Sequence, residues 1–140
     1  FEAVLRALVV RRLRANGTAE DEVQEALTKR IRNSLQNVHR AQAVIEKELG
    51  VPFYTASEAA VADRLASTFE KRHPITHNLG VVDRKYVENA LSAEREGREI
   101  RVTVDEIEEA MVASMKLLTL FHARIFRDQP TGQRAAPGGA

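Results

Sequence analysis

The spacing of aliphatic residues constrains the fold of this chain more than any other feature. These residues recur three, four or seven positions apart, whereas strands would show alternation, and this period is typical of amphipathic helices. The longest series consists of Val23, Leu27, Ile31, Leu35, Val38, Ile45 and Leu49. Aromatic residues make up only 5% of the 140 positions, with no tryptophan, which favours an aliphatic helical core over a β-sandwich or a disordered chain.

Turn and capping residues divide the first half of the chain into three expected helices. The first covers residues 1–15 and ends at an Asn-Gly pair. The second covers residues 18–49 without a break, over roughly 45 Å at about 1.5 Å per residue. The third opens with Thr55 and Glu58, a capping-box pair, and its apolar stripe ends in a charged residue, Arg72.

Proline and capping residues also organise the second half. Pro74 predicts that the third helix kinks there or ends before it. Asp83 is expected to cap a short helix that extends to Leu91, followed by an extended piece at residues 100–102. A second capping box, formed by Thr103 and Glu106, opens a last helix that reaches Ile125 and is expected to pack centrally. Two methionines of this helix are expected in the core or in a dimer contact, namely Met111 and Met115.

Four or five helices joined by short turns predict one all-α domain, an antiparallel helical bundle over residues 1–127. Residues 128–140 are rich in Pro, Gly, Ala and Gln and have no apolar period, so we expect a disordered, flexible tail or linker. Because the chain begins with Phe1 instead of Met, we expect a fragment or a processed product. Its apolar start is interrupted by charges and is far shorter than the ~20 residues of a membrane span, so no membrane association is expected.

Charge and cysteine content exclude several classes of function. The 21 Lys and Arg residues almost balance the 20 Asp and Glu residues, so a net charge of +1 supplies no field that would hold the whole molecule on nucleic acid. Any polyanion must therefore be recognised locally. The absence of cysteine excludes disulfides, cysteine zinc sites, iron–sulfur clusters and thiol nucleophiles, and it fits a reducing, cytoplasmic compartment.

The histidines do not form a recognisable metal site. His73 and His77 are spaced as in zinc proteases, but Pro74 occupies the position where that chemistry needs a glutamate base. Glu70 and His73 form one Glu-x-x-His unit, and helical di-iron proteins need two such units. We therefore expect neither a metal nor a cofactor.

Arginine and histidine side chains five positions apart suit phosphate ester chemistry instead. The Arg72 guanidinium would stabilise charge that builds on phosphoryl oxygens, and the His77 imidazole would take a proton from a ribose 2′-hydroxyl. The alternative is that Arg72 caps a helix or pairs with a carboxylate, while the histidines satisfy buried carbonyls.

Residues 69–86 carry a more specific signal, because they resemble the signature of HEPN domains, the higher eukaryote and prokaryote nucleotide-binding helical bundles. In that signature an Arg is followed by a polar residue and, after four to six intervening positions, by a His. Arg72, His73 and His77 match it, and the following His-Asn, Gly, Val-Asp and Lys-Tyr elements are also similar. The resemblance extends over residues 1–127 as an architecture, since the motif follows two long helices and precedes a terminal one.

The resemblance implies a metal-independent endoribonuclease of toxin–antitoxin systems, antiviral defence or RNA processing. It implies that His77 is the general base or proton-transfer residue, that Arg72 binds the phosphate, and that His73 orients Arg72 or assists proton transfer. Attack by the 2′-hydroxyl would leave a 2′,3′-cyclic phosphate and a 5′-hydroxyl. Residues expected to bind substrate are Asn78, Lys71, Arg84, Lys85 and Tyr86.

Alternatives remain for these substrate-binding residues. The basic ones, with Arg40, either line an RNA path or belong to a solvated face, and His39 either approaches the site or is structural. Asn78 either binds or caps a turn, and Tyr86 either stacks a base or forms the edge of the core.

The partners implied by the resemblance are RNA, a second copy that completes a composite site, and an antitoxin or fused upstream domain. The runner-up function is a noncatalytic HEPN module that binds nucleotide or RNA or serves as a dimerisation scaffold. A plain helical protein-interaction domain is a third.

Overall fold

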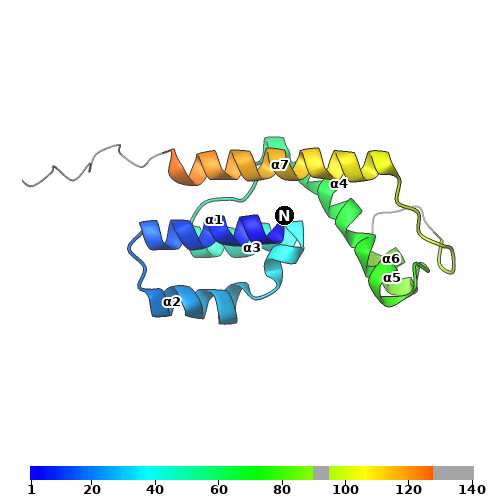
Figure 1. Cartoon of the computed structure of the whole chain (residues 1–140), viewed down its shortest axis with the longest axis horizontal. Helices are drawn as coiled ribbons and strands as arrows, with labels where there is room; N and C mark the ends of the chain where they lie inside the picture. The colour runs from blue at the N-terminus through cyan, green and yellow to red at the C-terminus, as the bar shows by residue number, and fades with distance from the viewer. Residues whose placement is uncertain (90–94, 128–140) are drawn as a thin grey trace, which may run out of the picture.

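The computed structural model describes residues 1–89 and 95–127, and its regular structure in these ranges is helical. The long helices are α1 (Glu2–Ala15), α3 (Val38–Leu49), α4 (Ala59–Glu70) and α7 (Val104–Phe126). Among these four, α1, α3 and α7 run in one direction and α4 runs in the opposite direction (Figure 1). The all-α prediction is confirmed. The extended piece expected at residues 100–102 forms no strand, and its neighbour Glu99 makes an isolated antiparallel bridge to Val81.

The single helix predicted over residues 18–49 is wrong. The chain instead forms α2 (Glu20–Glu25), a π-helical turn (Ala26–Ile31) and a short 3₁₀ turn (Ser34–Gln36) before α3 begins. Arg32, with φ of 45°, turns the backbone out of the helix. Ile31 and Leu35 are nevertheless buried, because the chain reverses around α1 and both sides of the turn face the same core. The apolar period of the sequence therefore continues even though the helix is interrupted.

The break at the end of α4 has a simple cause. Pro74 has no N–H to donate to the Glu70 carbonyl and its ring would clash there, so α4 ends at Glu70. A new helix, α5 (Arg72–His77), begins at once, with Pro74 in its first turn where no intrahelical donor is needed. The predicted kink or end is confirmed. As a result Arg72 lies exposed on α5 and is not part of the core stripe of α4.

A tight turn and a short helix follow α5. The N–H groups of Asn78 and Gly80 both donate to the Pro74 carbonyl, at 3.0 and 2.8 Å. The helix α6 (Arg84–Asn89) begins where the Asp83 carboxylate accepts the Tyr86 N–H at 2.7 Å, so the predicted cap at Asp83 is confirmed. The predicted helix end at Leu91 lies outside the described residues. Tyr86, Val82 and Ile100 form a small separate core.

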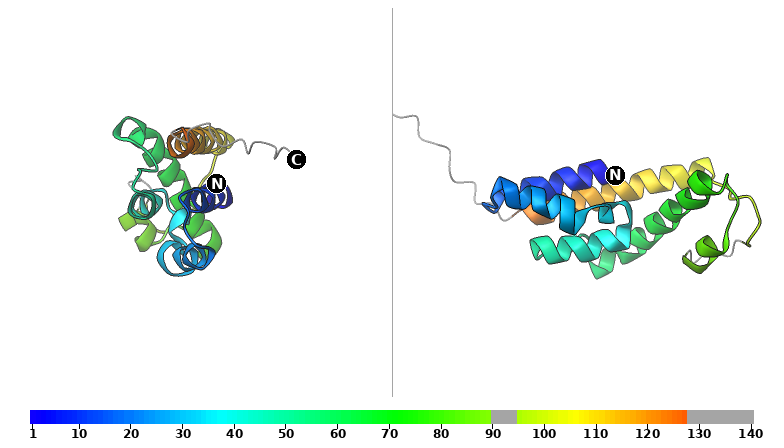
Figure 2. Two further views of the ribbon diagram at one scale, coloured as in Figure 1. Left: turned by 90° about the vertical axis from the view of Figure 1, so that its left-hand side faces the viewer. Right: turned by 90° about the horizontal axis from the view of Figure 1, so that it is seen from below.

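The main core lies between α1, α3, α4 and α7. Phe53 is fully buried and packs edge-on against Phe1 and Phe121, with ring centroids 5.9 and 5.4 Å apart. Figures 1 and 2 show α5 and α6 beyond this core, at the end of the molecule where α7 begins. None of the helices in the described ranges combines the length and apolar character that a bilayer crossing requires. The expected tail, residues 128–140, lies outside the described part.

The helix α7 opens with the predicted capping box, because the Thr103 N–H donates to the Glu106 carboxylate at 2.8 Å. The expectation that Met111 and Met115 lie in the core is wrong, since they are 64% and 66% exposed. Met111 lies two turns before the buried Leu118 on the same side of α7. The methionines are exposed because α1 lies beside the C-terminal half of α7 only (Figure 1). The expected alternative for these methionines, a dimer contact, stays a prediction.

Candidate functional site

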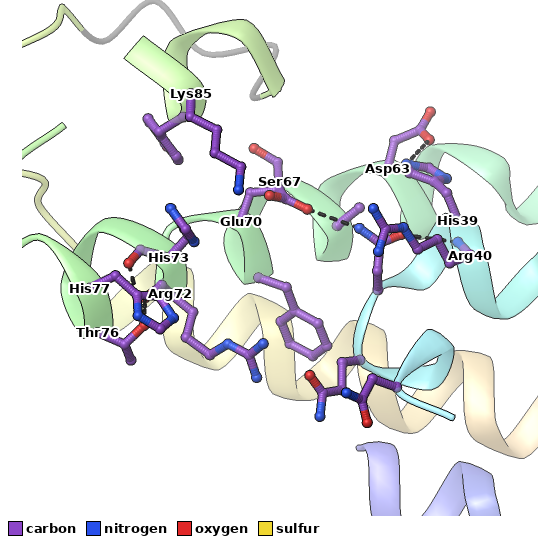
Figure 3. A pocket seen from close by; sticks show the side chains of 16 residues that line it. His39, Arg40, Asp63, Ser67, Glu70, Arg72, His73, Thr76, His77 and Lys85 are labelled. Atoms are coloured by element: carbon purple, nitrogen blue, oxygen red, sulfur yellow. Dashed lines mark hydrogen bonds and ion pairs between the residues drawn. The ribbon is translucent and has the colours of Figure 1, made fainter. Parts of the chain in front are cut away.

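An open cleft of about 710 Å³ lies between the start of α3, the end of α4 and the helices α5 and α6. Arg72, His73 and His77 enter it from α5, and Lys85 enters from α6 (Figure 3). The opposite wall comes from α3. The three residues expected to be catalytic therefore lie together on one cleft of a single chain.

The Arg72 side chain is exposed to solvent. It lines the cleft, and no described residue makes an ion pair or side-chain hydrogen bond with its guanidinium. Its backbone carbonyl accepts a hydrogen bond from the Thr76 hydroxyl at 2.8 Å. The alternative that Arg72 caps a helix or pairs with a carboxylate is not what the structure shows. Five N–H donors remain available for an anion.

His73 and His77 lie one turn apart on the same face of α5. Their ring centroids are 5.0 Å apart with planes inclined by 44°, because residues four positions apart stack along a helix. His77 is exposed, whereas His73 is half-buried with its Nε2 3.8 Å from Asp83 Oδ2. The two imidazoles thus differ in surroundings, one beside a carboxylate and the other open to the cleft.

Asp83 supplies that carboxylate in ionised form. Hydrogen bonds from the Tyr86 backbone N–H and, at 2.5 Å, from the Asn78 side-chain amide hold the pKa of Asp83 below its usual range, with help from His73 and Lys85. Asn78 therefore acts on the site through Asp83. It does not line the cleft, and its local hydrogen bond matches the capping alternative for this residue.

Two basic residues expected to bind substrate lie elsewhere. Lys71 turns to the start of α7, where its Nζ donates to Glu106 Oε1 at 2.5 Å and to the Arg101 carbonyl at 3.0 Å. Arg84 forms an exposed pair with Glu88 at 2.9 Å, outside the cleft lining. The carboxylate that Lys71 contacts lies 35 positions away in the sequence, whereas Arg84 pairs with a carboxylate four positions along its own helix.

The last two substrate candidates do reach the cleft. The exposed side chain of Lys85 extends into it in Figure 3. Tyr86 lines it too, but is only 3% exposed, so its ring is packed with Val82 and Ile100 and is not available to stack on a base. The core-edge alternative describes Tyr86.

The opposite wall carries His39 and Arg40 at the start of α3. His39 Nδ1 lies 3.0 Å from the Tyr54 hydroxyl, and its Nε2 lies 3.6 Å from Asp63 Oδ1. Burial raises the pKa of Tyr54, as does the neighbouring Asp63 carboxylate. His39 is thus fixed in place, while Arg40 extends with no side-chain partner among the described residues. Both reach the cleft only because the long helix breaks before α3.

Sequence reasoning missed the floor of the cleft. Asn37 donates from Nδ2 to Glu70 Oε1 at 2.9 Å. Ser67 also lines the cleft and lies beside Glu70 (Figure 3). The available signal was the polar stretch at positions 32–34 and 36–37, which interrupts the apolar series around Leu35. Read as a helix break with Asn37 as its cap, that stretch would have placed Asn37 at an edge of the site.

The arrangement gathers chemistry suited to a phosphate ester. Cationic side chains stand on two walls, with two adjacent imidazoles on one of them. Within residues 1–89 and 95–127, no three His, Asp or Glu side chains cluster in a way that could hold a metal ion. No family model, no curated protein and no solved structure matches this chain.

Proposed function

We propose that this chain is a metal-independent endoribonuclease of the HEPN type that acts on RNA in the cytoplasm, as a toxin or defence effector. The observation that carries the proposal is Arg72, which is exposed, unpaired with any described residue and shares one cleft with His77. A guanidinium and an imidazole in one open site are the two groups that 2′-hydroxyl attack on a phosphodiester requires.

The proposed steps use only side chains of the cleft. The neutral His77 imidazole takes the proton of a ribose 2′-hydroxyl, and the 2′-oxygen attacks the adjacent phosphorus. The bond between phosphorus and the 5′-oxygen breaks, and that oxygen takes a proton from the histidine pair. Arg72 binds the non-bridging oxygens as their charge grows. His73 can carry the proton for the leaving oxygen, because Asp83 offers it a counter-ion 3.8 Å away.

The proposal includes a homodimer, in which a second copy completes the cleft, and an antitoxin or a fused domain that restrains it. The open shape of the cleft in one chain is consistent with an additional wall from a partner. Lys85 and Arg40 would hold neighbouring phosphates on opposite sides of the reacting one.

The test incubates purified protein with RNA in EDTA. Arg72→Ala and His77→Ala should each lower the cleavage rate about 100-fold or more, the scale of losing a charge stabiliser or a general base. Matched controls are Arg98→Ala and His122→Ala, exposed residues outside the cleft lining, which should keep the full rate. Cleavage that survives in either cleft variant, or that no preparation shows, would refute the proposal.

A second candidate is a noncatalytic scaffold, favoured by one observation. The N-terminal half of α7 exposes an apolar stripe on the same side of the helix as its buried Leu118, and an apolar patch left exposed on a helix indicates a partner there. The stripe is formed by Val104, Ile107, Met111 and Met115. If Met111→Glu disrupts assembly in sedimentation analysis and the protein cleaves no RNA, the scaffold is the better account.

A further inference from the structure

The floor of the cleft holds a fixed set of hydrogen-bonding groups that phosphate chemistry does not use. Asn37 is the N-cap of α3, and its Oδ1 accepts the Arg40 backbone N–H at 3.0 Å. That bond fixes which way the amide faces, so Nδ2 must point to Glu70, where it donates to Oε1 at 2.9 Å. Both side chains are half-buried. The pair is therefore held in one orientation before any ligand arrives.

Glu70 places a negative charge in the cleft that is proposed to bind RNA, which is itself a polyanion. It is the last residue of α4, and in the view of Figure 3 its carboxylate lies between Lys85 and Arg40. No described cation forms an ion pair with it. Its Oε2 makes no hydrogen bond to a described residue, and Asn37 Nδ2 keeps a second N–H beyond the one given to Glu70. The floor thus offers one donor next to two carboxylate oxygens.

Guanine is the RNA base whose edge matches this set. Its Watson–Crick edge presents the O6 acceptor followed by two adjacent donors, N1–H and the N2 amino group, and a carboxylate accepts such a donor pair with both oxygens. Adenine and cytosine place an unprotonated ring nitrogen opposite the carboxylate, and uracil has one N–H between two carbonyl oxygens. Each of these would bring lone pairs against a negative charge, which is costly in a half-enclosed site.

We propose that the Asn37–Glu70 pair binds the Watson–Crick edge of a guanine base in the RNA substrate. Asn37 donates to O6, while Glu70 accepts from N1–H and N2–H. The base lies on the floor between Arg72 and Arg40, whose charges hold the phosphates on either side. This inference rests on the proposed function for its substrate class, RNA. It also explains why a carboxylate is placed there, since Glu70 repels phosphates and non-guanine bases alike and only guanine offsets that cost.

The experiment measures binding without cleavage. The probes are pentanucleotides of 2′-deoxyuridine around one central 2′-deoxynucleotide, so that no bond has an attacking 2′-hydroxyl and the whole probe stays intact. The central base is guanine, hypoxanthine, adenine or 7-deazaguanine, and affinity is read by fluorescence anisotropy. Guanine should bind about tenfold more tightly than hypoxanthine, which lacks the N2 donor, since a charge-assisted hydrogen bond is lost. Adenine should bind weaker still, and 7-deazaguanine, with the same Watson–Crick edge, should equal guanine.

Glu70→Gln provides the matched protein test. Glutamine keeps an oxygen for Asn37 but presents an N–H in place of the second acceptor, so the differences among guanine, hypoxanthine and adenine should shrink to within about twofold. The control Glu46→Gln changes an exposed carboxylate of α3 outside the cleft lining and should leave the preference intact. The hypoxanthine comparison in the unaltered protein needs no variant and remains decisive if Glu70→Gln fails to fold.

The outcomes separate this inference from the proposed function. Guanine-selective binding that depends on Glu70, in a protein that cleaves no RNA, supports the guanine subsite and refutes the nuclease. Cleavage that depends on Arg72 and His77, with equal affinity for all four probes, supports the nuclease and refutes the subsite. Equal binding of guanine and hypoxanthine, or a guanine preference unchanged in Glu70→Gln, also overturns the assignment of the Asn37–Glu70 pair.

Discussion

Two arginines at opposite ends of the molecule show how differently the same side chain is used. Arg124 of α7 donates to the Pro52 and Phe53 carbonyls at 3.0 and 2.7 Å and to both carboxylate oxygens of Glu58 at 2.9 and 2.8 Å. Arg72 of α5 makes no side-chain bond to any described residue. One guanidinium uses its donors to join the loop before α4 to α7, and the other keeps its donors for a ligand.

In a helical bundle, charged side chains without partners indicate where a ligand could bind. Arg124 is only 20% exposed in its side chain, and its bidentate pair with Glu58 also secures the capping box that opens α4. The Arg72 end has exposed charges and a positive-φ turn. Stability is therefore concentrated at the Arg124 end, and unsatisfied binding capacity at the Arg72 end.

The largest expected effect is on folding at the Arg124 end. Arg124→Ala should lower the free energy of unfolding by about 3 kcal/mol, because it leaves a half-enclosed Glu58 carboxylate and two carbonyls without their donor. Arg72→Ala should change it by less than about 0.5 kcal/mol, as expected for an exposed side chain with no partner. Urea unfolding of both variants measures this difference. Equal losses in the free energy of unfolding would show that the two arginines contribute alike to stability.

Acid should weaken the Arg124 end next. Burial alone would raise the pKa of Glu58, but the Thr55 N–H and the Arg124 guanidinium outweigh it and hold the pKa below the usual 4.5. A carboxyl whose folded pKa is lowered adds stability above its unfolded pKa and loses it as pH falls through the folded value. The urea concentration at the unfolding midpoint should therefore decrease when the pH is lowered below about 4.5.

The variant Arg124→Ala makes that pH test specific. Removing the guanidinium brings the folded pKa of Glu58 closer to its unfolded value, so the midpoint of the variant should fall less steeply with acid than that of the unaltered protein. Glu106, whose pKa is lowered by Lys71 and then by the Thr103 N–H, contributes the same slope in both proteins and so cancels. Parallel slopes would show that Arg124 does not set the charge of Glu58.

A smaller effect is expected in the turn at the Arg72 end. Leu79 has φ of 52° and is 98% exposed, so it bears the steric cost of a left-handed backbone with no contact to offset it. Leu79→Gly should raise the free energy of unfolding by up to about 1 kcal/mol, the strain relieved less the extra entropy of an unfolded glycine. Leu79→Ala keeps the strain and should give no gain. A loss of stability in Leu79→Gly would contradict this account of the turn.

The smallest effect is on RNA affinity. Lys85→Ala should weaken binding about threefold and lower the salt dependence by about one phosphate contact, because its ammonium lines the cleft. Arg84, its neighbour in sequence, pairs with Glu88 outside the lining, so Arg84→Ala should leave both quantities unchanged. Affinity titrations at several salt concentrations check this. Equal losses of RNA affinity in the two variants would show that a positive charge on α6 contributes equally inside and outside the cleft.

Local signals in the sequence predicted the parts of this fold that local chemistry controls. The capping boxes at Thr55 and Thr103, the break before Pro74 and the cap at Asp83 were all predictable, because each depends on residues within four positions. The break around Arg32 was not predictable from apolar spacing. Residues on both sides of it are buried in the same core, so the period of a continuous helix persists through a reversal of the chain.

The same distinction holds for the site. Arg72, His73 and His77 were predicted from one short segment, and the structure brings them to one cleft. Lys71 was placed there wrongly, because its partner Glu106 lies 35 positions away. Glu70 was noted only in a Glu-x-x-His unit, and its pairing with Asn37 was not predicted, because 33 positions separate the two residues and only the reversal before α3 brings them together. Contacts set by tertiary packing leave no local pattern to read.

The proposed function requires that Arg72 and His77 cut RNA through the ribose 2′-hydroxyl. The most direct measurement maps one cleavage site in a short RNA in EDTA and identifies the new ends by mass spectrometry, with and without a 2′-deoxy substitution at that nucleotide. Attack by the 2′-hydroxyl should give a 2′,3′-cyclic phosphate and a 5′-hydroxyl from the natural RNA, and should leave the bond intact in the substituted one. Cleavage of the 2′-deoxy bond, or ends that carry a 5′-phosphate, would contradict it.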